Sequence, residues 1–158
     1  MKQLQIIDHG RELTCGELYE AALRLAGYFD AVGLKPGDVV SFQLPNWWEA
    51  NVINLAAAMI GVVVDPIVPI NRDAEVSHML NASGTKVMFV PEVFRKFDYP
   101  AMLARILSAV SIRNPNCLCR RHAVSRRGRL LKWLASQWLR RSTSANQLDT
   151  SKNRLFTA

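Results

Sequence analysis

Residues 83–86, Ser-Gly-Thr-Lys, have the composition of a loop that binds phosphate through backbone N–H groups and a lysine. Such a loop needs a strand before it and a helix N-terminus after it. In this chain, apolar residues at helical spacing precede Gly84, and Lys86 opens the apolar run 86–90. We therefore predict that Gly84 ends a helix, and we assign no cofactor-binding role to these residues.

Histidine and cysteine provide the other reactive side chains. His9 lies in a polar turn and His78 on a predicted helix, and neither has a carboxylate or nucleophile at a spacing typical of catalysis. Cys117, Cys119 and His122 could be zinc ligands, but a fourth ligand and the usual pairs of ligands are missing. From the sequence we name no catalytic, cofactor-binding or metal-binding residue.

The charge of the chain is distributed unevenly. The net charge is +7, but residues 1–110 contain 9 Lys and Arg against 12 Asp and Glu, whereas residues 111–158 contain 11 against one. We therefore divide the chain at residue 110 and expect the basic segment 111–158 to be disordered or partly helical. A reading-frame shift would produce such a segment. The alternatives are incidental affinity for polyanions and an evolved arm that binds nucleic acid or an anionic surface.

The elements of the first 110 residues follow from hydrophobic periodicity and capping signals. Residues 4–7 and 12–14 suit a hairpin, and Thr14 with Glu17 forms a capping box for a helix that ends at Gly33. Helices and short apolar strands then alternate. The expected strands are 39–44, 62–64 and 86–90, and the expected helices are 47–60, 72–83 and one that begins near Pro100.

This alternation predicts an α/β fold, in which helices cover both faces of a parallel sheet. Asn46 is the expected N-cap of helix 47–60. Trp47 and Trp48 open that helix; we expect one of them to pack on the sheet and the other to be exposed or to touch a missing part of the protein. The longest apolar run, 55–64, is far shorter than the roughly 20 residues of a membrane span, so we expect a cytoplasmic protein.

Several segments of residues 1–110 resemble, in order and spacing, the N-terminal part of the adenylate-forming (AMP-binding) enzymes, which include the acyl-CoA synthetases. Segments 45–49 and 94–99 are most similar to ligases for medium-chain or cyclohexanecarboxylate-type acids. The other segments that carry the resemblance are Leu13–Leu18, Gly33–Val40, Leu44–Asn46, Leu55–Pro66 and Leu80–Val87.

The resemblance implies an enzyme that activates a carboxylic acid through an acyl adenylate to an acyl-CoA thioester, with ATP, Mg²⁺ and coenzyme A. It also places the phosphate loop, the Mg²⁺-linked carboxylate, the ribose-binding aspartate and the C-terminal lysine downstream of the matched stretch. We therefore expect an incomplete N-terminal subdomain that is inactive by itself and able to self-associate. The alternative is a non-catalytic interaction module whose tail binds nucleic acid or an anionic surface.

Overall fold

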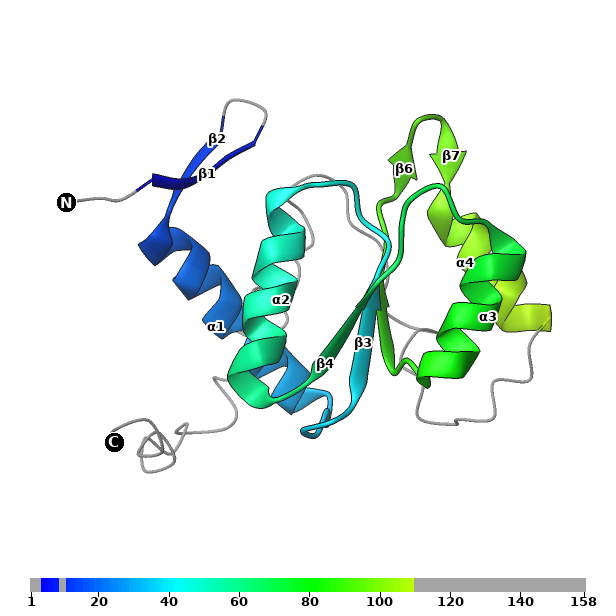
Figure 1. The fold of residues 1–158 in the computed structure, drawn as a ribbon, viewed down its shortest axis with the longest axis horizontal. Helices are drawn as coiled ribbons and strands as arrows, with labels where there is room; N and C mark the ends of the chain where they lie inside the picture. Colours follow the sequence, from blue (N-terminus) through cyan, green and yellow to red (C-terminus); the bar gives the residue numbers. More distant parts are fainter. Residues whose placement is uncertain (1–3, 9–10, 110–158) are drawn as a thin grey trace.

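The computed structural model describes residues 4–8 and 11–109. Strands β1 (Leu4–Asp8) and β2 (Arg11–Thr14) form an antiparallel hairpin, as predicted (Figure 1). Helix α1 (Cys15–Ala31) follows directly. Thr14 Oγ1 accepts a hydrogen bond from the Glu17 N–H, and Glu17 Oε2 accepts one from the Thr14 N–H at 2.9 Å. The predicted capping box is therefore confirmed.

The main sheet is parallel and contains β3 (Val39–Phe42), β4 (Val63–Pro66) and β5 (Val87–Phe89) in the order β4-β3-β5. Val40 is in register with Val64 on one side and with Val87 on the other. The central strand is thus the first of the three along the chain, and both of its neighbours are reached through a helix. This arrangement confirms the predicted α/β class.

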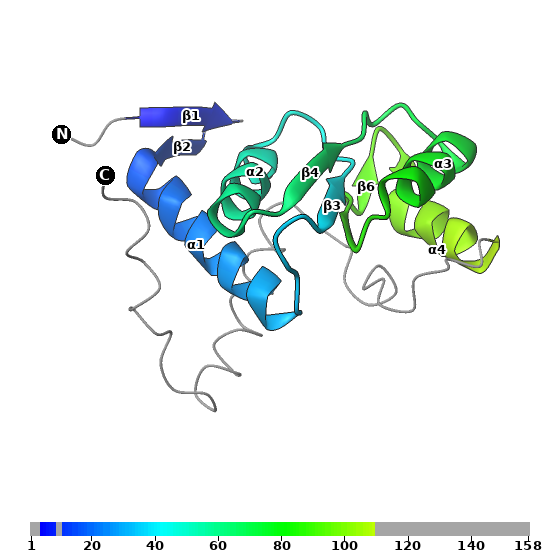
Figure 2. The same ribbon diagram turned by 60° about the horizontal axis from the view of Figure 1, so that its bottom comes forward.

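Helices cover both faces of this sheet. Helices α1 and α2 (Trp48–Ile60) lie on one face, and α3 (Asp73–Ser83) and α4 (Tyr99–Ala109) lie on the other (Figures 1 and 2). The sheet separates two apolar cores: Phe42 and Phe89 belong to the core of α1 and α2, whereas Met88 belongs to the core of α3 and α4. None of the helices described here has the length and apolar character needed to cross a membrane.

Near the amino ends of the strands, Gly61 packs closely against Pro36, and Lys86 forms an ion pair with Asp38. Gly61, the C-cap of α2, has φ of 72°, and a Cβ there would lie 3.2 Å from Pro36 Cβ. Lys86 Nζ lies 2.7 Å from Asp38 Oδ1. This hydrogen bond, together with one from the Lys35 N–H, lowers the pKa of the Asp38 carboxyl below its usual value.

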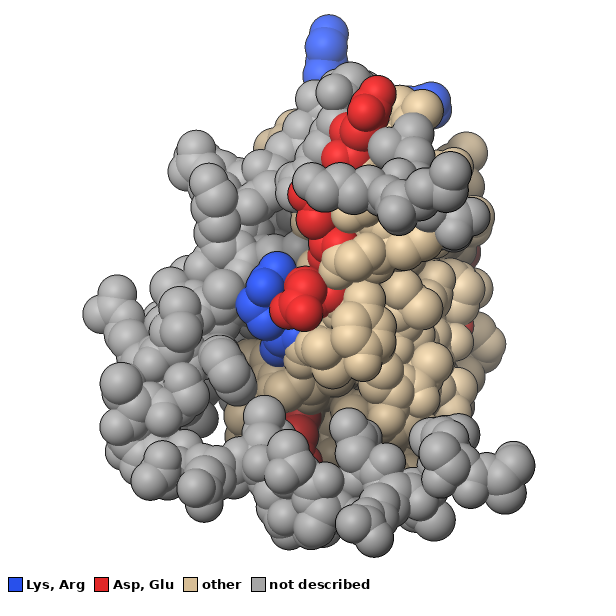
Figure 3. All heavy atoms as spheres, turned by 90° about the vertical axis from the view of Figure 1, so that its left-hand side faces the viewer, with Lys and Arg blue, Asp and Glu red and all other residues tan. Residues whose placement is uncertain are grey.

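On the face that carries β1, β2 and α1, the charged side chains of the described residues are mostly acidic (Figure 3). Figure 3 views the molecule from that side, and Asp and Glu side chains form a band across its described part. On α1, Arg24 lies 4.0 Å from Glu20, with both side chains well exposed, so this pair adds little stability. The view agrees with the excess of acidic residues in 1–110.

One local expectation is wrong and another is confirmed only in part. The N-cap of α2 is Trp47 rather than Asn46, and its side chain makes no capping bond; the Trp48 N–H instead points to Asp8 Oδ2 at 3.4 Å. Both tryptophans are buried in the core of α1 and α2, at 8% and 7% exposure, so the expected core packing is confirmed and the exposure expected for one of them is not. A hairpin of β6 (Val93–Phe94) and β7 (Phe97–Asp98) was not predicted.

Candidate functional site

The carboxyl ends of β3, β4 and β5 lie at one edge of the sheet, which is the edge where open α/β sheets bind ligands. Three segments leave the sheet there: residues 43–47 after β3, the loop 67–72 after β4, and residues 90–98 with the β6–β7 hairpin after β5. The second and third segments bring three cationic residues to this end of the molecule. We define Arg72, Arg95 and Lys96 as the cationic site.

The β6–β7 hairpin has an unusual turn. Phe94 is paired with Phe97, so Arg95 and Lys96 are the two turn residues. Their φ values are 49° and 64°, as a type I′ turn requires. Such turns favour Asn and Gly, because a side chain with a Cβ costs free energy in the left-handed region. Two long cationic side chains therefore occupy this turn although its positive φ values disfavour residues with a Cβ.

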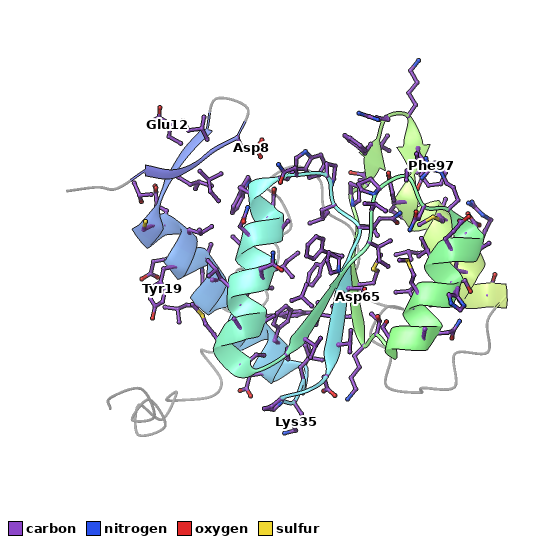
Figure 4. All side chains as sticks on the ribbon, in the orientation of Figure 1. Asp8, Glu12, Tyr19, Lys35, Asp65 and Phe97 are labelled. Carbon is purple, nitrogen blue, oxygen red and sulfur yellow. The ribbon has the colours of Figure 1, made fainter. Side chains whose placement is uncertain are left out.

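Aromatic contacts connect the hairpin to buried residues of the protein. The rings of Trp47 and Phe94 meet edge to face at a centroid distance of 5.9 Å, and those of Phe97 and Tyr99 do so at 5.0 Å. Trp47 and Tyr99 are both buried. Phe97 is the first residue of β7, at the end of the α3 and α4 layer (Figure 4). Phe94 packs against both cores, and Phe97 packs against the core of α3 and α4.

The guanidinium groups of the cationic site lie against the paired rings. Arg72 Cζ is 4.1 Å from the Phe97 ring centroid, and Arg95 Cζ is 5.4 Å from that of Phe94. Because Phe94 and Phe97 are directly opposed, their side chains share one face of the hairpin.

None of the three cations of the cationic site forms an ion pair with another described residue. All three are exposed. Guanidinium groups that are stacked and have free N–H donors are suited to phosphate or carboxylate ligands.

Substituting Lys96 tests the strain at this turn. We expect Lys96→Gly to raise the free energy of unfolding by about 1 kcal/mol, because glycine adopts positive φ without a steric penalty. Lys96→Ala is the matched control, since it removes the charge but keeps the Cβ and should leave stability nearly unchanged. Urea denaturation of the two variants measures the difference; a glycine variant no more stable than the alanine variant would refute the strain.

The Ser83–Lys86 segment is not a phosphate loop. Gly84 is the C-cap of α3, with φ of 65°, and Ser83 Oγ donates to the Met79 carbonyl at 2.8 Å. Lys86 is paired with Asp38 at the opposite edge of the sheet from the cationic site. The predicted helix end is therefore confirmed.

A buried chain of hydroxyl groups connects the middle of the sheet with the end of α3. Ser41 Oγ donates to Asp65 Oδ2 at 3.0 Å and also contacts Thr85 Oγ1, which lies 2.7 Å from Ser83 Oγ. Figure 4 labels Asp65 on β4, between the two helical layers. Ser41 is fully buried. These polar groups satisfy one another, so we regard them as structural.

Of the histidines and cysteines weighed above, the structure describes His78. His78 is exposed on α3, and His9 falls outside the described residues, as do Cys117, Cys119 and His122. In the described ranges, no three His, Cys, Asp or Glu side chains are placed to hold a metal ion. Sequence reasoning missed the cationic site, because an Arg-Lys pair between two phenylalanines does not contain the Asn or Gly that identifies a type I′ turn.

Comparison with known proteins identifies the family. The model of the AMP-binding enzyme family matches residues 2–148. The medium-chain fatty-acid–CoA ligase of Escherichia coli is 39% identical over 95 residues, which are 60% of this chain and 17% of that protein. The 2-hydroxy-7-methoxy-5-methyl-1-naphthoate–CoA ligase of Streptomyces carzinostaticus is 33% identical over 89 residues, which are 56% of this chain and 15% of that protein.

A solved structure supports the same fold. A benzoate CoA ligase from Burkholderia xenovorans LB400 superimposes with a TM-score of 0.63 at 20% sequence identity, covering 82% of this chain and 25% of that one. The architecture is that of the N-terminal part of such α/β enzymes. The chain belongs to the AMP-binding enzyme family. It spans less than a fifth of the length of the two curated relatives named above.

Proposed function

We propose that this chain is an N-terminal part of an AMP-forming ligase that converts a carboxylic acid to its CoA thioester through an acyl adenylate. The observation that carries the proposal is the family match over residues 2–148. The medium-chain fatty-acid–CoA ligase of E. coli, 39% identical over 95 residues, supports a medium-chain acid as the substrate class. Segments 45–49 and 94–99 support medium-chain or cyclohexanecarboxylate-type acids by their resemblance.

The contribution of this part is to position other groups rather than to break bonds. Its helical layers support the carboxyl edge of the sheet. The cationic site lies at this edge, and its three cationic residues are exposed. Because ATP and coenzyme A both carry phosphates, we assign the cationic site to a phosphate group of a substrate. The complete reaction needs Mg²⁺ and residues that the family resemblance places further along a full-length chain.

A chimera tests the proposal. Residues 2–109 of this chain would replace the corresponding stretch of the E. coli medium-chain ligase, and acyl-CoA formation would be measured with medium-chain acids. We expect the chimera to keep measurable activity. A chimera that also carries Arg72→Ala and Arg95→Ala should lose about tenfold in kcat/KM, because each charge-assisted hydrogen bond to a phosphate contributes more than a neutral one.

The matched control for the chimera is Arg24→Ala, which removes an exposed cation of α1 that is not part of the cationic site. This variant should retain the activity of the parent chimera. A chimera that folds cooperatively but makes no acyl-CoA would contradict the proposed function. Equal activity of the two arginine variants would contradict the role of the cationic site alone.

A further inference from the structure

Gln43 is a fully buried amide directly after the central strand. Its backbone N–H donates to the Phe89 carbonyl at 2.8 Å and so continues the pairing of β3 with β5. Its side-chain Nε2 donates two hydrogen bonds outside the sheet, to the carbonyls of Val68 at 3.0 Å and Asn71 at 2.9 Å. Both acceptors belong to the loop 67–72, so one side chain connects the core to this loop.

The orientation of this amide is determined by its donors. Gln43 Oε1 is buried and has no hydrogen-bond partner among the described residues. Turning the amide over would place Oε1 against two carbonyl oxygens and remove both bonds. A buried acceptor without a partner destabilises the fold, and an apolar residue of similar shape would avoid that cost. The amide at this position therefore serves to donate its two N–H groups to the loop.

The loop begins with Ile67, which is buried in the core of α3 and α4, but beyond that residue it is held mainly by hydrogen bonds. Val68 and Ile70 are 59% and 78% exposed. The Pro69 carbonyl accepts hydrogen bonds from Tyr99 Oη at 2.9 Å and from Arg72 Nη1 at 2.8 Å. With little apolar burial at 68 and 70, the conformation of the loop after Ile67 depends mainly on these polar bonds.

One carbonyl connects the buried amide to the surface cation. The Asn71 oxygen accepts a bond from Gln43 Nε2 and another from Arg72 Nη1, both at 2.9 Å. The guanidinium of Arg72 also lies on the Phe97 ring. Its position thus depends on the 69 and 71 carbonyls, and Gln43 holds the second of these from inside the protein.

We propose that Gln43 is a positioning residue, whose buried amide fixes the loop 67–72 and thereby places the Arg72 guanidinium over Phe97 to receive an anionic group. The anion-binding part of this inference rests on the proposed function. The placement of Arg72 does not, since it concerns the protein without ligand. Losing the two donors should leave the sheet formed but allow Arg72 to sample other rotamers.

The test uses the full chain labelled with ¹⁵N and observed by NMR, with the Arg72 Nε–H signal assigned by its loss in Arg72→Lys. Gln43→Met removes both donors and keeps the length of the side chain. In this variant we expect the signal to move from its ring-shifted position toward that of free arginine. The matched control is Ser41→Ala, a buried polar residue of β3 whose side-chain hydrogen bonds go to Asp65 and Thr85 rather than to the loop. This control should lower stability without moving the signal.

Titration with inorganic pyrophosphate is then observed at the same signal, because residues 111–158 carry 11 Lys and Arg that also attract pyrophosphate. We expect about fivefold weaker binding in Gln43→Met, since the anion must then order a flexible arginine. Tyr99→Phe removes only the hydrogen bond to the Pro69 carbonyl, and we expect it to move the Arg72 signal in the same direction. This second variant provides the test if Gln43→Met fails to fold.

The two proposals fail in different ways. If the Arg72 signal is unchanged in Gln43→Met, or moves equally in Ser41→Ala, Gln43 does not position Arg72. If Tyr99→Phe leaves the signal unchanged, the carbonyl bonds do not hold the guanidinium. A wild-type chain whose Arg72 signal does not respond to pyrophosphate would refute the anion-binding role, whereas the ligand-free comparison would still decide the role of Gln43.

Discussion

Reactions that contain this chain alone should show no carboxylate-dependent exchange of pyrophosphate into ATP. Acyl-adenylate formation requires a carboxylate and the α-phosphate to be oriented together, and charge to be stabilised as pyrophosphate leaves. The resemblance places the groups that do this downstream, and the stretch matched in the E. coli ligase is 17% of that protein. Orientation alone supplies roughly 7–11 kcal/mol of the barrier reduction, so the rate should fall below detection.

The measurement is incorporation of labelled pyrophosphate into ATP over a panel of medium-chain and cyclic acids. The E. coli medium-chain ligase provides the positive control, and a heat-inactivated sample of this chain provides the background. Exchange above that background, if it depends on the added acid, would show that residues of this chain assemble an adenylation site. The proposed division of labour between this part and the rest of the enzyme would then be wrong.

The fold class could be predicted because local signals and the overall pattern agree. The Thr14–Glu17 capping box and the glycines at positions 61 and 84 marked helix ends, and short apolar runs between them marked the strands. The structure confirms the parallel sheet and both helical layers. The boundary at residue 110 and the character of residues 111–158 stay predictions.

The candidate site could not be predicted in the same way. The turn at Arg95 and Lys96 is formed against local preference, since the support comes from Trp47, which is distant in sequence. The role of Gln43 depends on carbonyls more than twenty residues away, and an isolated glutamine in a strand gives no such signal. The same holds for α2, whose first turn is approached by Asp8 from the first hairpin. Tertiary contacts thus determine these features.

Phe29→Ala should have the largest effect on stability. Phe29 is fully buried on α1, and its ring centroid lies 6.1 Å from that of Phe89 on β5. It therefore joins the layer of α1 and α2 to the sheet. Replacing a buried phenylalanine by alanine costs about 3–5 kcal/mol, through lost apolar burial and the cavity left behind. A domain of this size has roughly 5–15 kcal/mol in total, so much of its stability would be lost.

Thermal unfolding followed by circular dichroism measures this loss, and we expect the midpoint to fall by at least about 12 °C. Tyr19→Ala is the matched control, because it removes another aromatic ring from the same helix at a position that is 53% exposed. This variant should unfold within about 0.5 kcal/mol of the wild type. Similar losses in the two variants would mean that α1 is not packed on the sheet through Phe29. The absence of any cooperative transition in the wild type would mean that residues 1–110 do not form the α/β unit by themselves.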